Sequence, residues 1–311
     1  MYPRGLVAKA PSSIANLGPL FDIAALAVNH SYDRVRVEVL GEVDGIRVEV
    51  EARGAPGGAA NTAYAVVERM LGYLGETLHV RLVVEKGVPV GQGLGSSAAS
   101  AAAAAYALNR LLGEPLSREE LVRFVGEAEA VAAGSPHFDN AAASVMGGLA
   151  VVLDAARPWV VSLRLPDDIR VVVFRPLREL VPREKKTMTM RSVLPERVGL
   201  REAVEWVRAA VALTAGLQSN PYEALRRASA GYAVEEARGR LIPGYVEAKR
   251  AALEAGAIAF NISGAGPTLF ALVREGEEDE VLHAVEPLLR RAWGELEARI
   301  VGVDYEGARE E

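Results

Sequence analysis

The sequence predicts an α+β protein of two domains. Short segments in which apolar and polar residues alternate, as they do in half-buried strands, are interspersed with longer segments of helical periodicity. The two kinds of segment do not alternate strictly, which argues against a repeated β-α-β arrangement around a parallel sheet. The 311 residues, 50% of them apolar, are enough for two medium-sized domains. A new set of strands begins near Arg157-Pro158, so we predict domains at 1–156 and 157–311.

The start of the chain is predicted to consist mainly of strands. In 32–39 three valines alternate with charged residues, and the same alternation recurs in 46–52. Shorter strands are expected at 5–10 and 23–29, on either side of the loop PSSIANLGPLFD at 11–22.

The rest of the first domain combines helices and strands. Helices are expected at 61–74, at 98–112 and at 117–132, where Ser117 and Glu120 have the spacing of a capping box. Strands are expected at 79–85 and 144–153, with a loop at 134–140.

The second domain repeats this mixture. Its predicted strands are 159–165, 169–174, 257–262, 268–274 and 296–304. Its predicted helices are 199–217, 221–230, 243–256 and 279–293, and 182–198 is expected to be a polar, irregular stretch.

Composition excludes several classes of function. The chain contains no cysteine, which excludes disulfides, thiolate chemistry and zinc–cysteine sites. A net charge of −6 and 6% aromatic residues argue against a nucleic-acid surface. The chain has no apolar run as long as the roughly 18 residues that a membrane span needs, and no signal-peptide pattern begins it. We therefore expect a soluble, cytoplasmic protein without a membrane or nucleic-acid partner.

The segment PVGQGLGSSAASAAAAA at 89–105 predicts a phosphate-binding loop. Its three glycines permit backbone conformations that a Cβ would block, and two serines follow at the start of an alanine-rich helix. The first turn of a helix offers unpaired N–H groups to an anion. The residues expected to contact a triphosphate are Pro89, Gly91, Gly93, Leu94, Gly95, Ser96, Ser97 and Ala98.

Two better-known glycine motifs do not fit this segment. A Walker loop requires a lysine after the last glycine, and none is present. The spacing from Gly93 to Ala98 satisfies the looser G-x-G-x-x-A dinucleotide pattern. The acidic residue that should end a second strand about twenty residues later is missing, because the chain is still helical to about Leu112.

Three segments, taken in order, resemble the three motifs of the GHMP kinases, the superfamily of galactokinase, homoserine kinase, mevalonate kinase and phosphomevalonate kinase. They are 10–22 (APSSIANLGPLFD), 89–99 and 261–268 (NISGAGPT). The first is most similar to the homoserine kinase version, as is RGRLIPGY at 238–245. Two departures are Leu20, where that family usually has glycine, and Glu235-Glu236, where it usually has Glu-Pro.

The resemblance implies a fold and an activity. The implied fold has an N-terminal, ATP-binding domain of the ribosomal-protein-like α+β type and a C-terminal ferredoxin-like α+β domain, with the active site between them. The implied reaction transfers the γ-phosphoryl group of ATP, with Mg²⁺, to the side-chain hydroxyl of L-homoserine, giving O-phospho-L-homoserine for threonine biosynthesis. The alternatives are another small-molecule kinase of the superfamily, of mevalonate or shikimate type, and a catalytically silent metabolite sensor.

The resemblance also implies positions for the metal and the nucleotide. Mg²⁺ prefers hard oxygen ligands, and Glu129 with the hydroxyl of Ser97, or alternatively that of Ser96, would supply them. Glu127, on another face of the same helix, is the alternative carboxylate. Asn61 is expected beside the adenine, although it would also suit a helix cap. Lys86 is expected near the nucleotide, with a solvated surface position as the alternative.

L-homoserine is a zwitterion, so its pocket should contain a carboxylate and an arginine. Asp22, assisted by Asp139, is expected to bind the ammonium group, whereas Arg191 and Arg238 are expected to bind the carboxylate. The remaining expected substrate contacts are Thr187, four residues before Arg191, and the backbone at Gly264.

The last group of predicted residues concerns the attacking hydroxyl. Asn16 and Asn140 are expected to orient it, and His137 is expected to touch the substrate or the γ-phosphate. No motif supplies a His or Lys base, so we predict a transfer without a dedicated base. Apolar strand edges could pair two subunits into a homodimer or could face the other domain, and both interpretations stay open.

Overall fold

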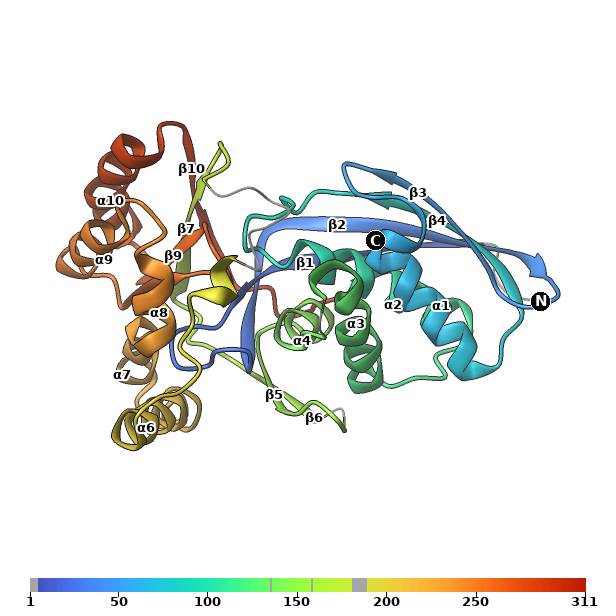
Figure 1. The fold of residues 1–311 in the computed structure, drawn as a ribbon, viewed down its shortest axis with the longest axis horizontal. Coiled ribbons are helices and arrows are strands. Elements are labelled where there is room, and N and C mark those ends of the chain that lie inside the picture. The colour runs from blue at the N-terminus through green and yellow to red at the C-terminus, as the bar shows by residue number, and fades with distance from the viewer. Residues whose placement is uncertain (1–4, 135, 158, 181–188) are drawn as a thin grey trace.

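The computed structural model describes residues 5–134, 136–157, 159–180 and 189–311. The chain forms two α+β units, each built on its own sheet, and they lie end to end along the long axis of the molecule (Figure 1). This confirms the predicted two-domain α+β fold.

The first unit is a seven-stranded sheet. Its central path has the order β11-β1-β2-β4-β3, and β5 joins β2 while β6 pairs with β5. Every pairing within it is antiparallel except that of β3 with β4. The strands are β1 (Gly5–Ala15), β2 (Ala24–Glu42), β3 (Arg47–Arg53), β4 (Leu78–Glu85), β5 (Leu149–Asp154), β6 (Trp159–Leu163) and β11 (Arg309–Glu310).

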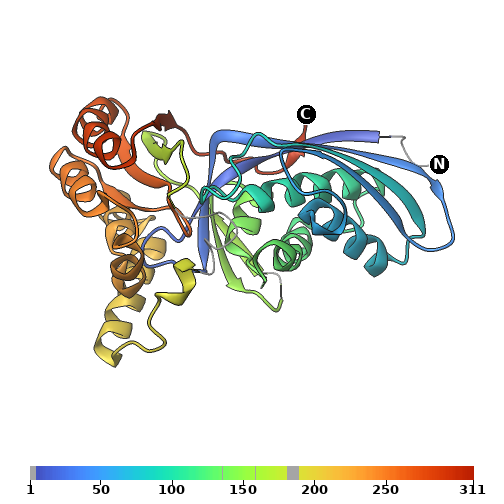
Figure 2. The same cartoon turned by 45° about the horizontal axis from the view of Figure 1, so that its top comes forward.

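Four helices cover one face of this sheet (Figure 2). They are α1 (Thr62–Leu74), α2 (Ser96–Leu111), α3 (Arg118–Ala133) and α4 (Asp139–Met146), with a short 3₁₀ turn η1 (Gly58–Ala60) before α1. The sheet turns its apolar side toward them: Val35 and Val37 of β2 are fully buried, whereas the neighbouring Arg34 and Arg36 are exposed. The alanines of α2 are fully buried, and their small side chains let this helix contact α1, α3, α4 and β1 at once.

The second unit is a four-stranded antiparallel sheet of order β10-β7-β9-β8. Its strands are β7 (Ile169–Pro176), β8 (Ala259–Ile262), β9 (Leu269–Arg274) and β10 (Leu296–Val301). Its helices are α6 (Leu200–Gly216), α7 (Pro221–Arg226), α8 (Tyr232–Gly239), α9 (Tyr245–Glu254) and α10 (Glu278–Trp293), with a 3₁₀ turn η2 (Arg227–Ser229). The sequence β-α-β-β-α-β, with the last strand beside the first, is the predicted ferredoxin-like arrangement.

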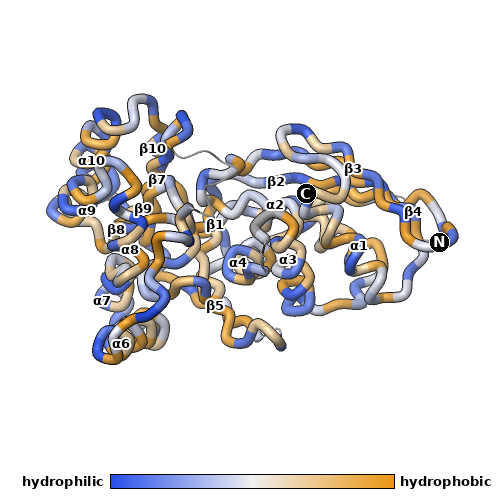
Figure 3. The backbone as a smooth tube through the Cα atoms, in the orientation of Figure 1, coloured by the Kyte–Doolittle hydropathy of each residue, from blue (hydrophilic) through white to orange (hydrophobic). Residues whose placement is uncertain are grey.

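A shared core joins the two units. Successive residues of β7 point to opposite faces of the second sheet. Val172 and Phe174 pack with residues of α9 and α10, whereas Val171 and Val173 belong to a cluster that also contains Leu17 of the first unit. Leu20 is 2% exposed in this shared cluster, so the side chain that replaces the family glycine packs in the core. Figure 3 shows hydrophobic residues concentrated where the sheets and helices pack.

Several predicted boundaries are wrong. Residues 139–146 form α4, so the predicted strand 144–153 begins only at Leu149, after two glycines with positive φ end the helix. A short apolar run fits either a buried strand or a buried helix, which is why its periodicity misleads. Helix α8 was not predicted. β1 continues through Pro11 to Ala15, because a register shift after Pro11 accommodates a residue that cannot donate to the ladder.

The predicted domain division after residue 156 remains a prediction. The hydrogen-bonded sheets do not divide the chain at that point, since β6 and β11 both follow it and both belong to the first sheet.

Candidate active site

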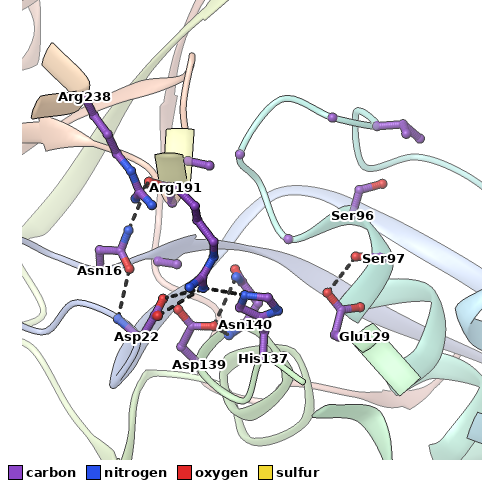
Figure 4. A pocket seen from close by; sticks show the side chains of 17 residues that line it. Asn16, Asp22, Ser96, Ser97, Glu129, His137, Asp139, Asn140, Arg191 and Arg238 are labelled. Carbon is purple, nitrogen blue, oxygen red and sulfur yellow. Dashed lines mark hydrogen bonds and ion pairs between the residues drawn. The ribbon is translucent and has the colours of Figure 1, made fainter. Parts of the chain in front are cut away.

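A cleft lies where the two units meet. Its volume is about 280 Å³ and it is partly open to solvent, which is close to the lower end of the range for small-molecule sites. Fourteen of the predicted site residues line it: Asn16, Asp22, Gly91, Gly93, Gly95, Ser96, Ser97, Glu129, His137, Asp139, Asn140, Arg191, Arg238 and Gly264. Figure 4 shows Ser97 and Glu129 at one end and Asp22, Arg191 and Arg238 at the other.

Glycine is required at two positions of the loop before α2. Gly93 has φ +83°, and a Cβ there would lie 2.5 Å from the carbonyl oxygen of Ser263. Gly95 has φ +67°, and its Cβ would lie 2.1 Å from Ser13 Oγ. Both the left-handed backbone and the close packing therefore exclude a side chain. The loop is held against β1 on one side and against the turn before β9 on the other.

Hydrogen bonds from two neighbouring segments fix this loop. Ser263 Oγ donates to Gly93 O at 2.6 Å, and Ser13 N donates to Leu94 O at 3.0 Å. Ser96 Oγ donates to Val88 O at 2.9 Å. Because the Ser96 hydroxyl is used within the loop, the donors that the loop leaves for an anion are backbone amides.

The N-terminus of α2 opens toward the cleft. Its N-cap residue, Gly95, has no side chain, and among the described residues no other side chain caps this end. The first amide with a helical acceptor is that of Ala99, which donates to Gly95 O at 3.0 Å. The preceding amides have no acceptor within the helix and, together with its dipole, suit a phosphate group.

Ser97 and Glu129 form an oxygen-rich pair in the cleft. Ser97 Oγ donates to Glu129 Oε2 at 2.8 Å. Glu129 is only 6% exposed, and its buried Oε1 has no hydrogen-bond partner among the described residues. Burial raises the pKa of Glu129 to about 7. An unpartnered buried carboxylate oxygen beside a hydroxyl fits a hard cation such as Mg²⁺.

This pair would be only part of a coordination shell. Among the described residues, no group of three or more acidic or histidine side chains forms a complete metal site. Water or phosphate oxygens would have to complete it, as is usual for Mg²⁺. The alternative carboxylate, Glu127, lies 4.0 Å from Arg69 in an exposed pair.

An ion pair between Asp22 and Arg191 occupies the other end. Arg191 Nη2 lies 3.0 Å from Asp22 Oδ2, and the two side chains are 38% and 41% exposed for Arg191 and Asp22. Arg191 Nη2 also lies 2.6 Å from His137 Nε2. A guanidinium can only donate, so the lone pair of His137 Nε2 is engaged by Arg191.

Asn16 holds the loop that carries Asp22. It adopts φ +82°, which asparagine tolerates better than most residues. Its Oδ1 accepts from Asp22 N at 3.2 Å, and its Nδ2 donates to Gly264 O at 3.0 Å. The side chain thus links the first motif to the third.

Arg238 approaches from the second unit. It is 3% exposed, donates to Met190 O at 3.1 Å and to Gly264 O at 2.9 Å, and lies over the ring of Phe21. Burial lowers its pKa to about 10, so it remains a cation at neutral pH. It adds a second positive charge to the end of the cleft that contains Asp22.

Asp139 and Asn140 lie between the two ends. Asp139 Oδ1 accepts from Asn140 N at 2.7 Å and Nδ2 at 3.3 Å, and Ser13 Oγ donates to Asn140 Oδ1 at 2.8 Å. Burial, with a contribution from the charge of Asp22, raises the pKa of Asp139 to about 6. The side-chain NH₂ group of Asn140 has two protons, and only one of them is used in these hydrogen bonds.

The structure does not bring every predicted residue into the cleft. Asn61 caps α1, accepting from Ala63 N at 2.9 Å and donating to Pro56 O at 2.7 Å. Lys86 pairs with Asp33 beneath the loop. Three predicted loop residues do not line the cleft, namely Pro89, Leu94 and Ala98, and Thr187 lies outside the described residues.

Sequence reasoning missed several contributors. Ala15 and Val90 line the cleft, and Ser13 and Ser263 hold the loop. Asp33 could have been found from its position, two residues before Val35 on the core-facing side of an alternating strand. A carboxylate at such a position requires a buried partner.

Comparison with known proteins agrees with this geometry. The family model for the GHMP kinases N terminal domain matches residues 61–148, and the model for GHMP kinases C terminal matches residues 209–288. A homoserine kinase from Aeropyrum pernix is 41% identical over 274 residues, covering 87% of this chain and 87% of the relative. One from Pyrobaculum islandicum is 38% identical over 278 residues, covering 89% of this chain and 91% of the relative.

A solved structure shows the same arrangement. The crystal structure of homoserine kinase from Cytophaga hutchinsonii is 30% identical to this chain and superposes with a TM-score of 0.86. The match covers 99% of this chain and 98% of that one.

Proposed function

We propose that this chain, which belongs to the GHMP kinase family, is an ATP-dependent homoserine kinase. The observation that carries the proposal is the pairing of two sites in one cleft. A glycine loop with a helix N-terminus lies at one end, and an accessible carboxylate–arginine pair, Asp22 and Arg191, lies at the other. The first end suits a polyphosphate, and the second suits an amino acid. The homoserine kinases that match most of the chain support the same substrate.

The nucleotide end binds the triphosphate through backbone. Amides of the first turn of α2 contact the phosphates, and the glycines let the backbone approach closely. Ser97 and Glu129 hold Mg²⁺, whose contribution when bound is to neutralise phosphate charge during transfer. Pro89, Leu94 and Ala98 do not line the cleft and support the conformation of this loop.

The substrate end binds L-homoserine by exchanging ion pairs. Without substrate, Asp22 and Arg191 neutralise each other across 3.0 Å. The ammonium group takes the place of Arg191 beside Asp22, with Asp139 nearby, and the carboxylate binds Arg191 and Arg238. A ligand with a carboxylate but no ammonium group, such as mevalonate, would leave Asp22 unpaired.

Phosphoryl transfer needs positioning and charge neutralisation more than a strong base. The unassigned amide proton of Asn140 orients the attacking hydroxyl, and Asn16 positions Asp22. Without substrate, Arg191 Nη2 contacts His137 Nε2 at 2.6 Å, and a loose phosphoryl-transfer transition state requires no strong base at this position. We therefore expect His137→Gln to leave substantial turnover.

The test is a coupled assay of ADP release with homoserine, mevalonate, galactose and shikimate as acceptors. Homoserine should give the highest kcat/KM. Turnover with another alcohol but not with homoserine would overturn the substrate assignment. Nucleotide binding without any phosphorylated product would favour the silent sensor.

A further inference from the structure

A buried ion pair lies beneath the glycine loop, outside the cleft. Lys86 directly follows β4 and pairs with Asp33 of β2. The Lys86 side chain is 8% exposed and that of Asp33 is fully buried. Burying two charges is costly unless their remaining hydrogen-bonding capacity is satisfied. The contacts of each partner therefore indicate what the pair does.

Asp33 holds the start of the loop and the side of α2. Its Oδ1 accepts from Gly87 N and Val88 N, both at 2.9 Å, and its Oδ2 accepts from Ser100 Oγ at 2.6 Å. One carboxylate thus joins β2, the first residues after β4 and the second turn of the helix that follows the loop.

Lys86 reaches the first turn of the same helix. Besides Asp33, its ammonium group donates to Ser96 O at 2.6 Å and to Ser100 Oγ at 2.8 Å. An ammonium group has three protons, so these three contacts use all of them. Lys86 in this arrangement has no donor left for a phosphate, and its side chain is buried and not solvated at the surface.

The contact with Ser96 O fixes the direction of one peptide group. In a planar trans peptide the carbonyl and the following N–H point in opposite directions. With the Ser96 carbonyl held by Lys86, the N–H of Ser97 points out of the helix N-terminus toward the cleft, which Ser97 lines. The pair is neutral overall, so its effect on an anion comes from this orientation and not from net charge.

We propose that Lys86 and Asp33 are positioning residues for the nucleotide, which hold the Ser96–Ser97 peptide and the loop before it in the phosphate-binding orientation. This inference rests on the proposed function, because it assumes that the loop binds ATP.

The experiment compares Lys86→Met, the double variant Lys86→Met/Asp33→Asn and wild type. Three quantities are measured: Tm, the Kd for MgADP by calorimetry and the KM for homoserine. Lys86→Met should lower Tm, since it leaves a buried carboxylate unpaired. The double variant removes that charge but keeps an acceptor for Gly87 and Val88, so Tm should largely recover. Its Kd for MgADP should nevertheless stay about tenfold or more above wild type, because the peptide is no longer held.

The matched control is Lys249→Met in the second unit. Like Lys86, Lys249 pairs with a carboxylate, that of Glu235, and donates to a backbone carbonyl, Ser229 O at 2.6 Å. It should lower Tm and leave the Kd for MgADP within about twofold of wild type. If Lys86→Met does not fold, Ser100→Ala, which removes only the bridging hydroxyl, should weaken MgADP severalfold while the KM for homoserine stays unchanged.

The outcomes separate the two proposals. If wild type binds no MgADP, the proposed function is wrong. If wild type binds MgADP and the double variant or Ser100→Ala binds it equally well, the positioning role is wrong and the proposed function stands. If the Kd for MgADP and the KM for homoserine rise by the same factor, the substitution damages the whole site. That result would also contradict the positioning role.

Discussion

Under the proposed function, single residues of this cleft should decide which substrate binds. Asp22 and Arg191 are accessible and satisfy each other, so a ligand must offer both charges to replace their pairing without leaving one unmatched. Such a pair favours zwitterions over simple anions. The preference comes from the penalty for an unpaired charge as much as from new contacts.

Replacing Asp22 should therefore affect substrate binding more than chemistry. In Asp22→Ala the KM for homoserine should rise about 10- to 100-fold, with a much smaller change in kcat, because a charge-assisted contact to a non-reacting group is lost. Steady-state kinetics at saturating ATP measures both. Asp44→Ala, which changes an exposed aspartate in a turn of the first sheet, is the control. An unchanged KM for Asp22→Ala would contradict the assignment of the ammonium site.

Glu129 should make stability depend on pH. Its folded pKa of about 7 lies above the ordinary 4.5, so between these values the folded state binds more protons than the unfolded state. This contribution to stability is therefore lost as pH rises from 4.5 through 7. In EDTA, the Tm of wild type should fall relative to that of Glu129→Gln between pH 5 and pH 8. Excess Mg²⁺ should raise the Tm of wild type at pH 8 but not that of the variant. If Tm in EDTA changes with pH in the same way for both proteins, Glu129 does not become a buried charge in this pH range.

Most of the cleft residues could be predicted from the sequence, but their hydrogen bonds and ion pairs could not. The motifs contain Asn16, Asp22, Ser97 and Gly264, so their gathering could be predicted. The pairing of Lys86 with Asp33 could not, because they are 53 residues apart and join only through the register of β2 with β4. The role that we propose for them rests on three-dimensional contacts alone.

At the scale of elements, we propose that the loop and helix α2 act as one anion-binding unit. The small alanine side chains of α2 let the helix pack closely between three helices and the sheet. This packing fixes the N-terminus of α2 at the cleft. The loop is then held by serines of two other segments, Ser13 and Ser263. The binding geometry is therefore set by packing behind the loop.

A methyl group at Gly95 should disrupt this unit. Gly95→Ala adds a Cβ that would lie 2.1 Å from Ser13 Oγ, at a residue with φ +67°. Gly113→Ala is the matched control, since Gly113 has φ +85° but no atom within 4 Å of its Cβ position. In both variants the free energy of unfolding should fall by about 1–2 kcal/mol, because alanine is strained in the left-handed backbone conformation. Only Gly95→Ala should also raise the KM for ATP, by about tenfold or more; similar KM values for the two variants would contradict the packed-loop account.

Element types were predictable where the pattern was long or carried a cap. The helix from Ser117 has the predicted capping box, and the alternating valines of β2 face the helices. The sequence before Gly147 resembles a strand, although it is helical, because a short buried segment has no distinguishing period. Helix α8 has a mixed surface and a non-glycine start at positive φ, Tyr232 with φ +46°, which gave no local signal.

At the scale of the whole molecule, a shared core joins the two sheets beside the cleft. Leu17 and Leu20 of the first unit pack with Val171 and Val173 of the second. Residues after 301 also return to the first sheet and end in β11. Among the described residues, no helix is both long and apolar enough to span a bilayer.

Because the units share a core, they should unfold together. Calorimetry should show one transition, and Leu20→Ala should lower its midpoint without splitting it, with a loss of about 2–5 kcal/mol for a fully buried leucine. Leu40→Ala, at an exposed leucine of β2, is the control and should change the midpoint little. Two separate transitions in wild type would contradict the shared core.

The most direct measurement is a crystal structure with a non-hydrolysable ATP analogue, Mg²⁺ and L-homoserine. Phosphate density should lie against the amides at the start of α2, with the metal between Ser97 and Glu129 and the amino acid between Asp22 and the two arginines. A triphosphate bound elsewhere, or homoserine outside the cleft, would contradict the account.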